Sequence, residues 1–103
     1  MKFMMVGKLK GRGIVNPEER TALCTQKISA LEIRLLQRYL TAGAYDFCTL
    51  IDAPNLAMAT AFNLWWIGQG FGQSELLQVF EEDEFAAITA LMRNPPEGRA
   101  DAG

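Results

Sequence analysis

The spacing of apolar and polar residues divides the chain into alternating strand-like and helix-like segments. Residues 2–9 (KFMMVGKL) form a short apolar run that ends at the turn-rich KGRG, which is typical of a buried strand. A helix is predicted from about 17 to 29. Asn16 can cap this helix, Pro17 suits its first position, and Glu19 stands three residues after the cap.

The segment from 30 to 41 fits two patterns. Four residues recur at helical spacing and would extend the helix to about 40, namely Ile28, Leu31, Leu35 and Tyr39. Alternatively, every second residue from Ile33 to Thr41 lines one face of a strand. The local pattern favours the helix.

Three more elements follow a turn at 41–44. YDFCTLID at 45–52 is rich in aromatic and β-branched residues, which favours a strand. Pro54 and Asn55 open a predicted helix over 55–67, and Gly68 and Gly70 close it. FGQSELLQVF at 71–80 is predicted to be the next strand.

The last part of the chain is more acidic and more polar than the segments before it. Acidic residues at 81–84 suit the positive end of a helix dipole, so a last helix is predicted to begin there. NPPEGRADAG at 94–103 is polar and contains proline and glycine, which indicates a disordered tail. We therefore expect one domain over 1–93.

Both faces of two predicted strands are apolar, which bears on association. Phe3 and Met5 alternate with Met4 and Val6, and the strand at 45–52 repeats the pattern. Helices can cover one face, and a second sheet would cover the other. We therefore expect the protein to have itself as partner, in a homodimer or a higher oligomer.

Composition narrows the function classes. The chain has 103 residues, half of them apolar, and a net charge of -2, which gives no overall attraction to nucleic acid. No apolar run approaches the ~20 residues of a membrane span, and the start lacks a signal-peptide pattern, so a cytoplasmic location is expected. Histidine is absent, and Cys24 and Cys48 are too few for a disulfide framework or a zinc site, so neither a metal nor a cofactor is predicted.

The hairpin region carries a family resemblance. Gly43-Ala44-Tyr45-Asp46, followed by an apolar strand and Asp52-Ala53-Pro54, resembles the G-x-Y-D core of the GYD-domain family. Flanking matches extend this resemblance over roughly 3–90, at Gly7-Lys8, Gly13-Ile14, Ser74-Glu75-x-Leu77, Phe80 and Glu84-Phe85. Two departures stand out, because Ala44 replaces a common acid and the second helix carries bulky aromatic residues.

The resemblance implies a fold more than an activity. It implies an α+β, ferredoxin-like βαββαβ arrangement with a four-stranded antiparallel sheet and a short C-terminal helix, within the dimeric α/β-barrel group. In that fold the segment 30–41 is a strand paired with 45–52. The family has no single established reaction.

Glu75 is the first candidate for chemistry. It alternates with Leu77 and Val79, so strand geometry places its carboxylate on an apolar face. A buried carboxylate needs a partner or takes a raised pKa, as general acids and bases do. We expect Glu75 to be partly buried, with Arg34, Arg38, Tyr39 or Tyr45 as its partner; the alternative is an acid that reaches solvent.

The hairpin motif has two interpretations. In the favoured one it is a turn, in which Gly43 has a positive φ and Asp46 accepts backbone hydrogen bonds. In the other, Tyr45 and Asp46 form an acid–base pair, although neighbouring strand residues face opposite sides. Similarly, the basic loop of Lys8, Lys10 and Arg12 is favoured as solvated surface over an anion site, since its glycine spacing matches no phosphate-loop motif.

Two adjacent tryptophans cannot share one helical stripe. Phe62 follows Ala59 by three residues, and Trp66 follows Phe62 by four, so the three side chains form one stripe of the helix. We therefore expect Trp66 in the core. We expect the ring of Trp65 to be covered by another subunit or by a ligand.

Two functions are compatible with these patterns. The first is a homodimer that binds a small hydrophobic molecule between sheet and helices, with Phe62, Trp65, Trp66 and Arg38 at the pocket or the interface. The alternative is a small cofactor-independent enzyme, monooxygenase- or cyclase-like, in which Glu75 and a tyrosine (Tyr39 or Tyr45) move protons. The alternative rests on fold analogy alone.

Overall fold

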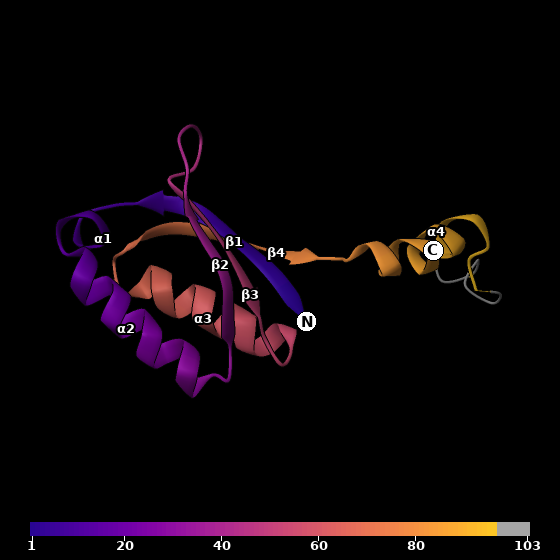
Figure 1. Cartoon of the computed structure of the whole chain (residues 1–103), viewed down its shortest axis with the longest axis horizontal. Helices are drawn as coiled ribbons and strands as arrows, with labels where there is room; N and C mark the ends of the chain where they lie inside the picture. Colours follow the sequence, from indigo (N-terminus) through magenta and orange to yellow (C-terminus); the bar gives the residue numbers. More distant parts are fainter. Residues whose placement is uncertain (97–103) are drawn as a thin grey trace.

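Four antiparallel strands form one sheet, and two helices cover one of its faces (Figure 1). The computed structural model describes residues 1–96. The elements along the chain are β1 (Lys2–Leu9), α1 (Arg12–Val15), α2 (Pro17–Ala30), β2 (Arg34–Leu40), β3 (Phe47–Asp52), α3 (Leu56–Gly68), β4 (Gly72–Val79) and α4 (Glu82–Arg93). The strand order is β2-β3-β1-β4. This is the ferredoxin-like α+β arrangement, so the fold prediction is confirmed; the sheet of the chain is open rather than a closed barrel.

The segment from 30 to 41 is a strand, and the helical alternative is wrong. Helix α2 ends at Ala30, and Glu32 takes a left-handed φ of 58° that turns the chain. β2 then pairs with β3 from Arg34 opposite Asp52 to Leu40 opposite Phe47. A continued helix would forfeit this ladder, which is a tertiary interaction that local periodicity does not contain.

β2 also departs from simple alternation. The register shifts between Leu35 and Gln37, so one residue is bulged. Leu35, Arg38 and Leu40 lie opposite Ile51, Thr49 and Phe47, and partners in an antiparallel ladder share a face. The bulge therefore turns Arg38 toward the helix-covered side, whereas strict alternation would separate it from Leu35.

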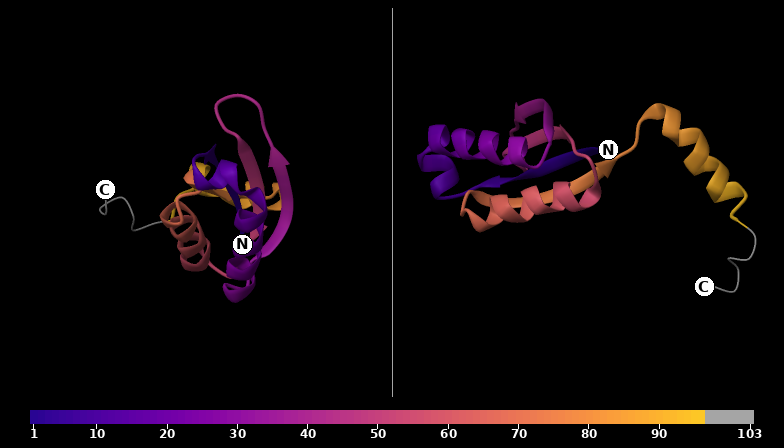
Figure 2. Two further views of the ribbon diagram at one scale, coloured as in Figure 1. Left: turned by 90° about the vertical axis from the view of Figure 1, so that its left-hand side faces the viewer. Right: turned by 90° about the horizontal axis from the view of Figure 1, so that it is seen from below.

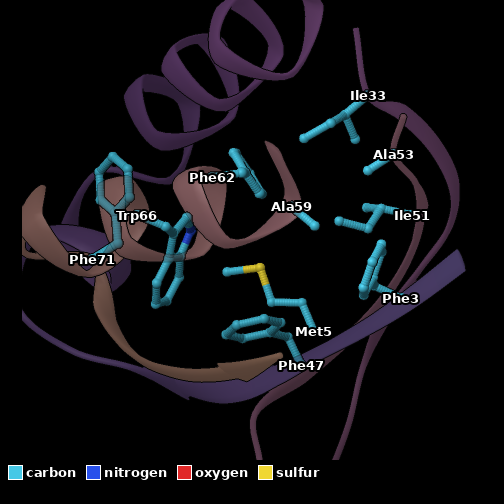
Figure 3. Close-up of a cluster of buried hydrophobic side chains, with 10 residues drawn as sticks. All are labelled: Phe3, Met5, Ile33, Phe47, Ile51, Ala53, Ala59, Phe62, Trp66 and Phe71. Atoms are coloured by element: carbon cyan, nitrogen blue, oxygen red, sulfur yellow. The ribbon is translucent and has the colours of Figure 1, made fainter. Parts of the chain in front are cut away.

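The core lies between the sheet and the helices (Figure 3). Its largest fully buried side chains are Phe3 and Met5 of β1, Ile51 of β3, and Phe71. Helix α3 contributes Ala59, Phe62 and Trp66, in the stripe that the sequence predicted. Trp66 is only 4% exposed, which confirms its predicted place in the core.

Helix α1 is a single helical turn, which the sequence pattern did not predict. Its Gly13 packs directly on the backbone of Phe71, and a β-carbon at position 13 would lie 2.0 Å from the Phe71 carbonyl oxygen. The Lys10 amide donates to that same oxygen at 2.9 Å. The Gly-Ile match to the family thus marks a backbone contact that joins α1 to the start of β4.

Helix α4 projects away from the rest of the chain (Figures 1 and 2). The radius of gyration is 16.8 Å, against the about 13 Å expected for a compact chain of this length. Glu81 and Glu84 form a capping box at the start of α4, so the helix is stabilised locally. Its apolar residues are exposed, namely Phe85, Ile88, Leu91 and Met92.

Two observations complete the description of residues 1–96. Among them, no helix is both long enough and apolar enough to cross a bilayer. The predicted disordered tail spans 94–103, of which 97–103 lie outside the described residues.

The contact at Gly13 generates a first prediction. Gly13→Ala forces its new methyl group against backbone that cannot yield easily, so the free energy of unfolding should fall by about 2–3 kcal/mol. Gly68→Ala is the matched control, because the methyl group that it adds at the end of a helix has no neighbouring atom within 4 Å. Urea denaturation should show Gly68→Ala unchanged or more stable. Equal losses for the two variants would contradict this packing.

The tryptophan pair generates a second prediction. Trp66→Ala removes a buried ring and should cost about 3–5 kcal/mol in unfolding free energy. Trp65→Ala removes a partly exposed ring and should cost about 1–2 kcal/mol. Denaturation of both variants measures the difference; similar costs would contradict the distinct placements of the two rings.

Candidate functional site

A cavity of about 280 Å³ lies between α2 and the β2–β3 half of the sheet. Helix α2 faces it with Thr21, Cys24, Thr25 and Ile28, at the spacing of one helical stripe. Three of these four side chains are small, and α2 has no fully buried residue. The helix therefore covers the sheet without filling the space beneath it.

The opposite walls of the cavity are apolar and aromatic. Phe47, Phe62 and Trp66 line it, together with Met5 and Ile51. The Trp66 ring lies 5.1 Å from that of Phe47 and 5.8 Å from that of Phe71, tilted in both cases. Packed rings of this kind form a stiff wall, so the cavity is lined by side chains with little freedom to collapse into it.

Two arginines reach the cavity from opposite walls. Arg20 stands on α2, one turn before Cys24, and Arg38 stands on β2. The Arg20 guanidinium donates to the carbonyl oxygen of Gly13. Arg38 has neither a hydrogen bond nor an ion pair with another of the residues 1–96. The site thus combines an apolar body with positive charge.

Cys24 is the titratable group inside the cavity whose pKa is perturbed. Burial raises the pKa of its thiol, while the positive charges of Arg20 and Arg38 and a hydrogen bond with Trp66 act in the opposite direction and only partly offset it. The thiol is therefore neutral near pH 7. It is a poor nucleophile there, because thiolate is the reactive form.

The sequence predicted that another subunit or a ligand covers the ring of Trp65. Part of that ring is instead covered by residues of the same chain. Its ring lies 5.8 Å from the Phe62 ring and 6.0 Å from the Phe71 ring. The Lys27 ammonium of α2 lies 5.7 Å above it. Trp65 does not line the cavity, whereas Trp66, Phe62 and Arg38 do.

The expectation for Glu75 is wrong in the single chain. Its side chain shares a face with Leu77, as predicted. That face is the one opposite the helices, and Glu75 is exposed there rather than buried. Within residues 1–96 its carboxylate has no hydrogen-bond or ion-pair partner, and Arg34 pairs instead with Asp52 at 2.7 Å. The reason is that none of the helices in residues 1–96 covers this face. Glu75 is therefore not in the cavity.

The two tyrosines do not join Glu75 either. Tyr39 is half exposed on the edge strand, where it lies opposite Cys48. In the register Cys48 is followed by Val6 and then Glu75, so Tyr39 and Glu75 stand at opposite edges of the sheet. Tyr45 is exposed in the hairpin loop. Tyr39 lines the cavity, but Glu75 and Tyr45 do not, so the candidate catalytic set is not assembled among residues 1–96.

The G-x-Y-D motif has a structural role, as favoured. Gly43 has a φ of 132°, which L side chains rarely adopt. The Asp46 carboxylate accepts a hydrogen bond from the Leu9 amide at 2.9 Å, and the Asp46 amide donates to the Gly7 carbonyl at 2.8 Å. The motif therefore ties the β2–β3 hairpin to β1.

The basic loop also has a structural role at Arg12. Its guanidinium pairs with Glu19, donates to the Gln69 carbonyl oxygen at 3.1 Å, and lies 5.1 Å above the Phe71 ring. These contacts hold Arg12 within the fold, so it is not available to bind an anion. This agrees with the interpretation of the segment as something other than an anion site. Across residues 1–96, no group of three or more carboxylates or thiols is placed to hold a metal ion.

Sequence reasoning missed the α2 side of the cavity. Arg20 and Cys24 were not linked to Arg38, because that link depends on β2 being a strand with a bulge. One signal was present: Thr21, Cys24, Thr25 and Ile28 form an inward stripe of mostly small side chains. A helix with small residues on its inner face leaves space against a sheet.

Comparisons with known proteins agree with this fold. The structure of 5-chloro-2-hydroxyhydroquinone dehydrochlorinase (TftG) from Burkholderia phenoliruptrix AC1100, in complex with 2,5-dihydroxybenzoquinone, is similar, with a TM-score of 0.54 and 13% sequence identity. The match covers 82% of this chain and 98% of that one. A comparison with curated proteins finds no match. The family model described as the GYD domain matches residues 3–89, and the chain therefore belongs to the GYD domain family.

Proposed function

We propose that this protein is a homodimer that binds a small, largely apolar molecule in the cavity between α2 and the sheet. The observation that carries the proposal is the cavity itself, of about 280 Å³ with aromatic walls. Ligand sites are commonly concave, mainly apolar, and furnished with a few polar groups. Here the polar groups are two arginines, the Tyr39 phenol, the Cys24 thiol and threonine hydroxyls. The size suits a molecule of one or two rings.

The fold neighbour supports the size class of the ligand. TftG, with which this chain shares the fold, was solved with 2,5-dihydroxybenzoquinone, a single-ring compound. The enzyme alternative has less support, because Tyr39 lines the cavity without Glu75 or Tyr45 and the Cys24 thiol is neutral. Binding is therefore the proposed activity.

The homodimer is supported by the open face of the sheet. One row across three strands is entirely apolar, with Leu50 of β3 and Leu77 of β4 on either side of Met4 of β1. In the next row Val6 lies between Cys48 and Glu75, so this row carries a charge at its β4 end. An apolar sheet face of this kind is normally covered by a second layer. A second copy, sheet against sheet, supplies it.

Helix α4 supports the same partner. It carries an apolar stripe that the rest of residues 1–96 leaves exposed, and it begins three residues after the end of β4, an edge strand of the open face. A sheet-to-sheet dimer places the second copy next to this strand. Contact with that copy would bury the stripe of α4 as well as the sheet.

The cavity generates a prediction about ligand binding. A neutral two-ring probe, 2-naphthamide, should bind the protein and quench the fluorescence of Trp66, which lines the cavity. Cys24→Phe fills the space and should weaken binding at least about tenfold, or about 1.4 kcal/mol. Fluorescence titration measures both affinities.

The matched control for that experiment is Gln26→Phe. It adds the same ring to the same helix at an exposed position outside the cavity, and it should leave the affinity for 2-naphthamide unchanged. Absence of binding to the wild-type protein, or equal weakening by the two variants, would contradict a ligand site at this cavity.

The open face generates a prediction about assembly. In light scattering at micromolar concentration, the wild-type protein should have the mass of two 11.4 kDa chains. Leu77→Glu places a charge in the apolar row and should shift the equilibrium to monomer. Leu64→Glu is the control, because Leu64 is exposed to 62%, against 50% for Leu77, but lies on α3. A monomeric wild type, or dissociation by Leu64→Glu alone, would exclude this interface.

A further inference from the structure

The walls of the cavity have an unbalanced charge. Two arginines line it, Arg20 and Arg38, and among residues 1–96 no aspartate or glutamate does. The chain has more acidic than basic residues, 12 against 10. The charged side chains of the cavity are both basic, which is the opposite of the overall charge. The imbalance is therefore a local property of the site.

The partners of the two guanidiniums do not neutralise them. Arg20 donates to a backbone carbonyl, that of Gly13, which is uncharged. Arg38 has no hydrogen-bond or ion-pair partner within residues 1–96, whereas Arg34 on the same strand is paired with Asp52. Arg38 is exposed, so water surrounds its guanidinium, and an anion bound there would take the place of that water as a direct, charge-assisted partner.

The charges of both arginines act on Cys24. Each of them pulls the pKa of the Cys24 thiol downward, so both positive charges lie near one point of the cavity wall. Cys24 cannot supply the missing anion itself, because burial outweighs these charges and keeps the thiol protonated near pH 7. A bound molecule can supply the negative charge.

We infer that the ligand of this cavity is an apolar organic acid, whose anionic group is held by Arg38 with Arg20 nearby and whose body lies against Phe47, Phe62 and Trp66. The inference rests on the proposed ligand-binding function and specifies its chemical class. A planar guanidinium matches a carboxylate, to which it can donate two parallel hydrogen bonds. Because Arg38 is exposed over part of its side chain, the anionic group lies at the open side of the cavity and the rings lie inside.

A matched pair of probes tests the inference. 2-Naphthoate and 2-naphthamide have the same rings and differ in charge. Isothermal titration calorimetry at pH 7 and about 0.1 M salt, where surface charges are largely screened, should show 2-naphthoate binding the wild-type protein about tenfold more tightly. Arg38→Gln should reduce this ratio to about one and leave the affinity for 2-naphthamide unchanged.

Two further variants isolate the cause. Arg34→Gln removes a charge from the same strand, outside the cavity, and should leave both affinities unchanged. Arg38→Lys keeps the charge without the planar fork and should retain part of the preference. Melting curves of all variants identify any that do not fold, and Arg38→Lys then replaces Arg38→Gln as the test.

The outcomes separate the inference from the proposed function. Equal affinity of the wild type for the two probes overturns the inference and leaves the ligand-binding function standing. A preference that survives Arg38→Gln also overturns it, because another group then holds the anion. Failure of the wild type to bind either probe overturns the proposed function and the inference together.

Discussion

A four-stranded sheet has two faces, and two helices can cover only one of them. This constraint governs the rest of the molecule. On the covered face, β1 and β3 contribute Phe3, Met5 and Ile51 to a well-packed core. On the other face, β1 carries Met4 and Val6, which the chain leaves without a helical layer. The fold therefore produces a hydrophobic core and an apolar surface from the same strands.

The covered face is not packed uniformly. Helix α3 fills its share of the space with Phe62 and Trp66, while α2 presents threonine and cysteine to the sheet. The cavity of about 280 Å³ is open on one side, so the aromatic side chains that line it forgo packing partners that a fuller α2 would supply. The stiff aromatic wall keeps this space open. A binding function would explain why the space has not been filled by larger residues on α2.

Features set by interactions between residues close in sequence could be predicted from the sequence, whereas features set by tertiary contacts could not. Caps and glycines located α2 and α3 to within about one residue, because Asn16 and Asn55 act on their own helix ends. The helical phase placed Trp66 correctly for the same reason. β2 was decided by its ladder with β3, which only the family resemblance supplied. Glu75 was assigned to the correct face, but burial of that face depends on atoms outside the chain.

The bulge in β2 has a consequence for how the molecule meets others. β2 is an edge strand, and a regular edge offers its free amides and carbonyls to any passing strand. The register shift between Leu35 and Gln37 breaks that row and twists the strand locally. Continuation of the sheet into a neighbouring molecule is thereby discouraged along this edge. Face-to-face contact remains open, so the irregularity that turns Arg38 inward also steers association away from endless sheet growth.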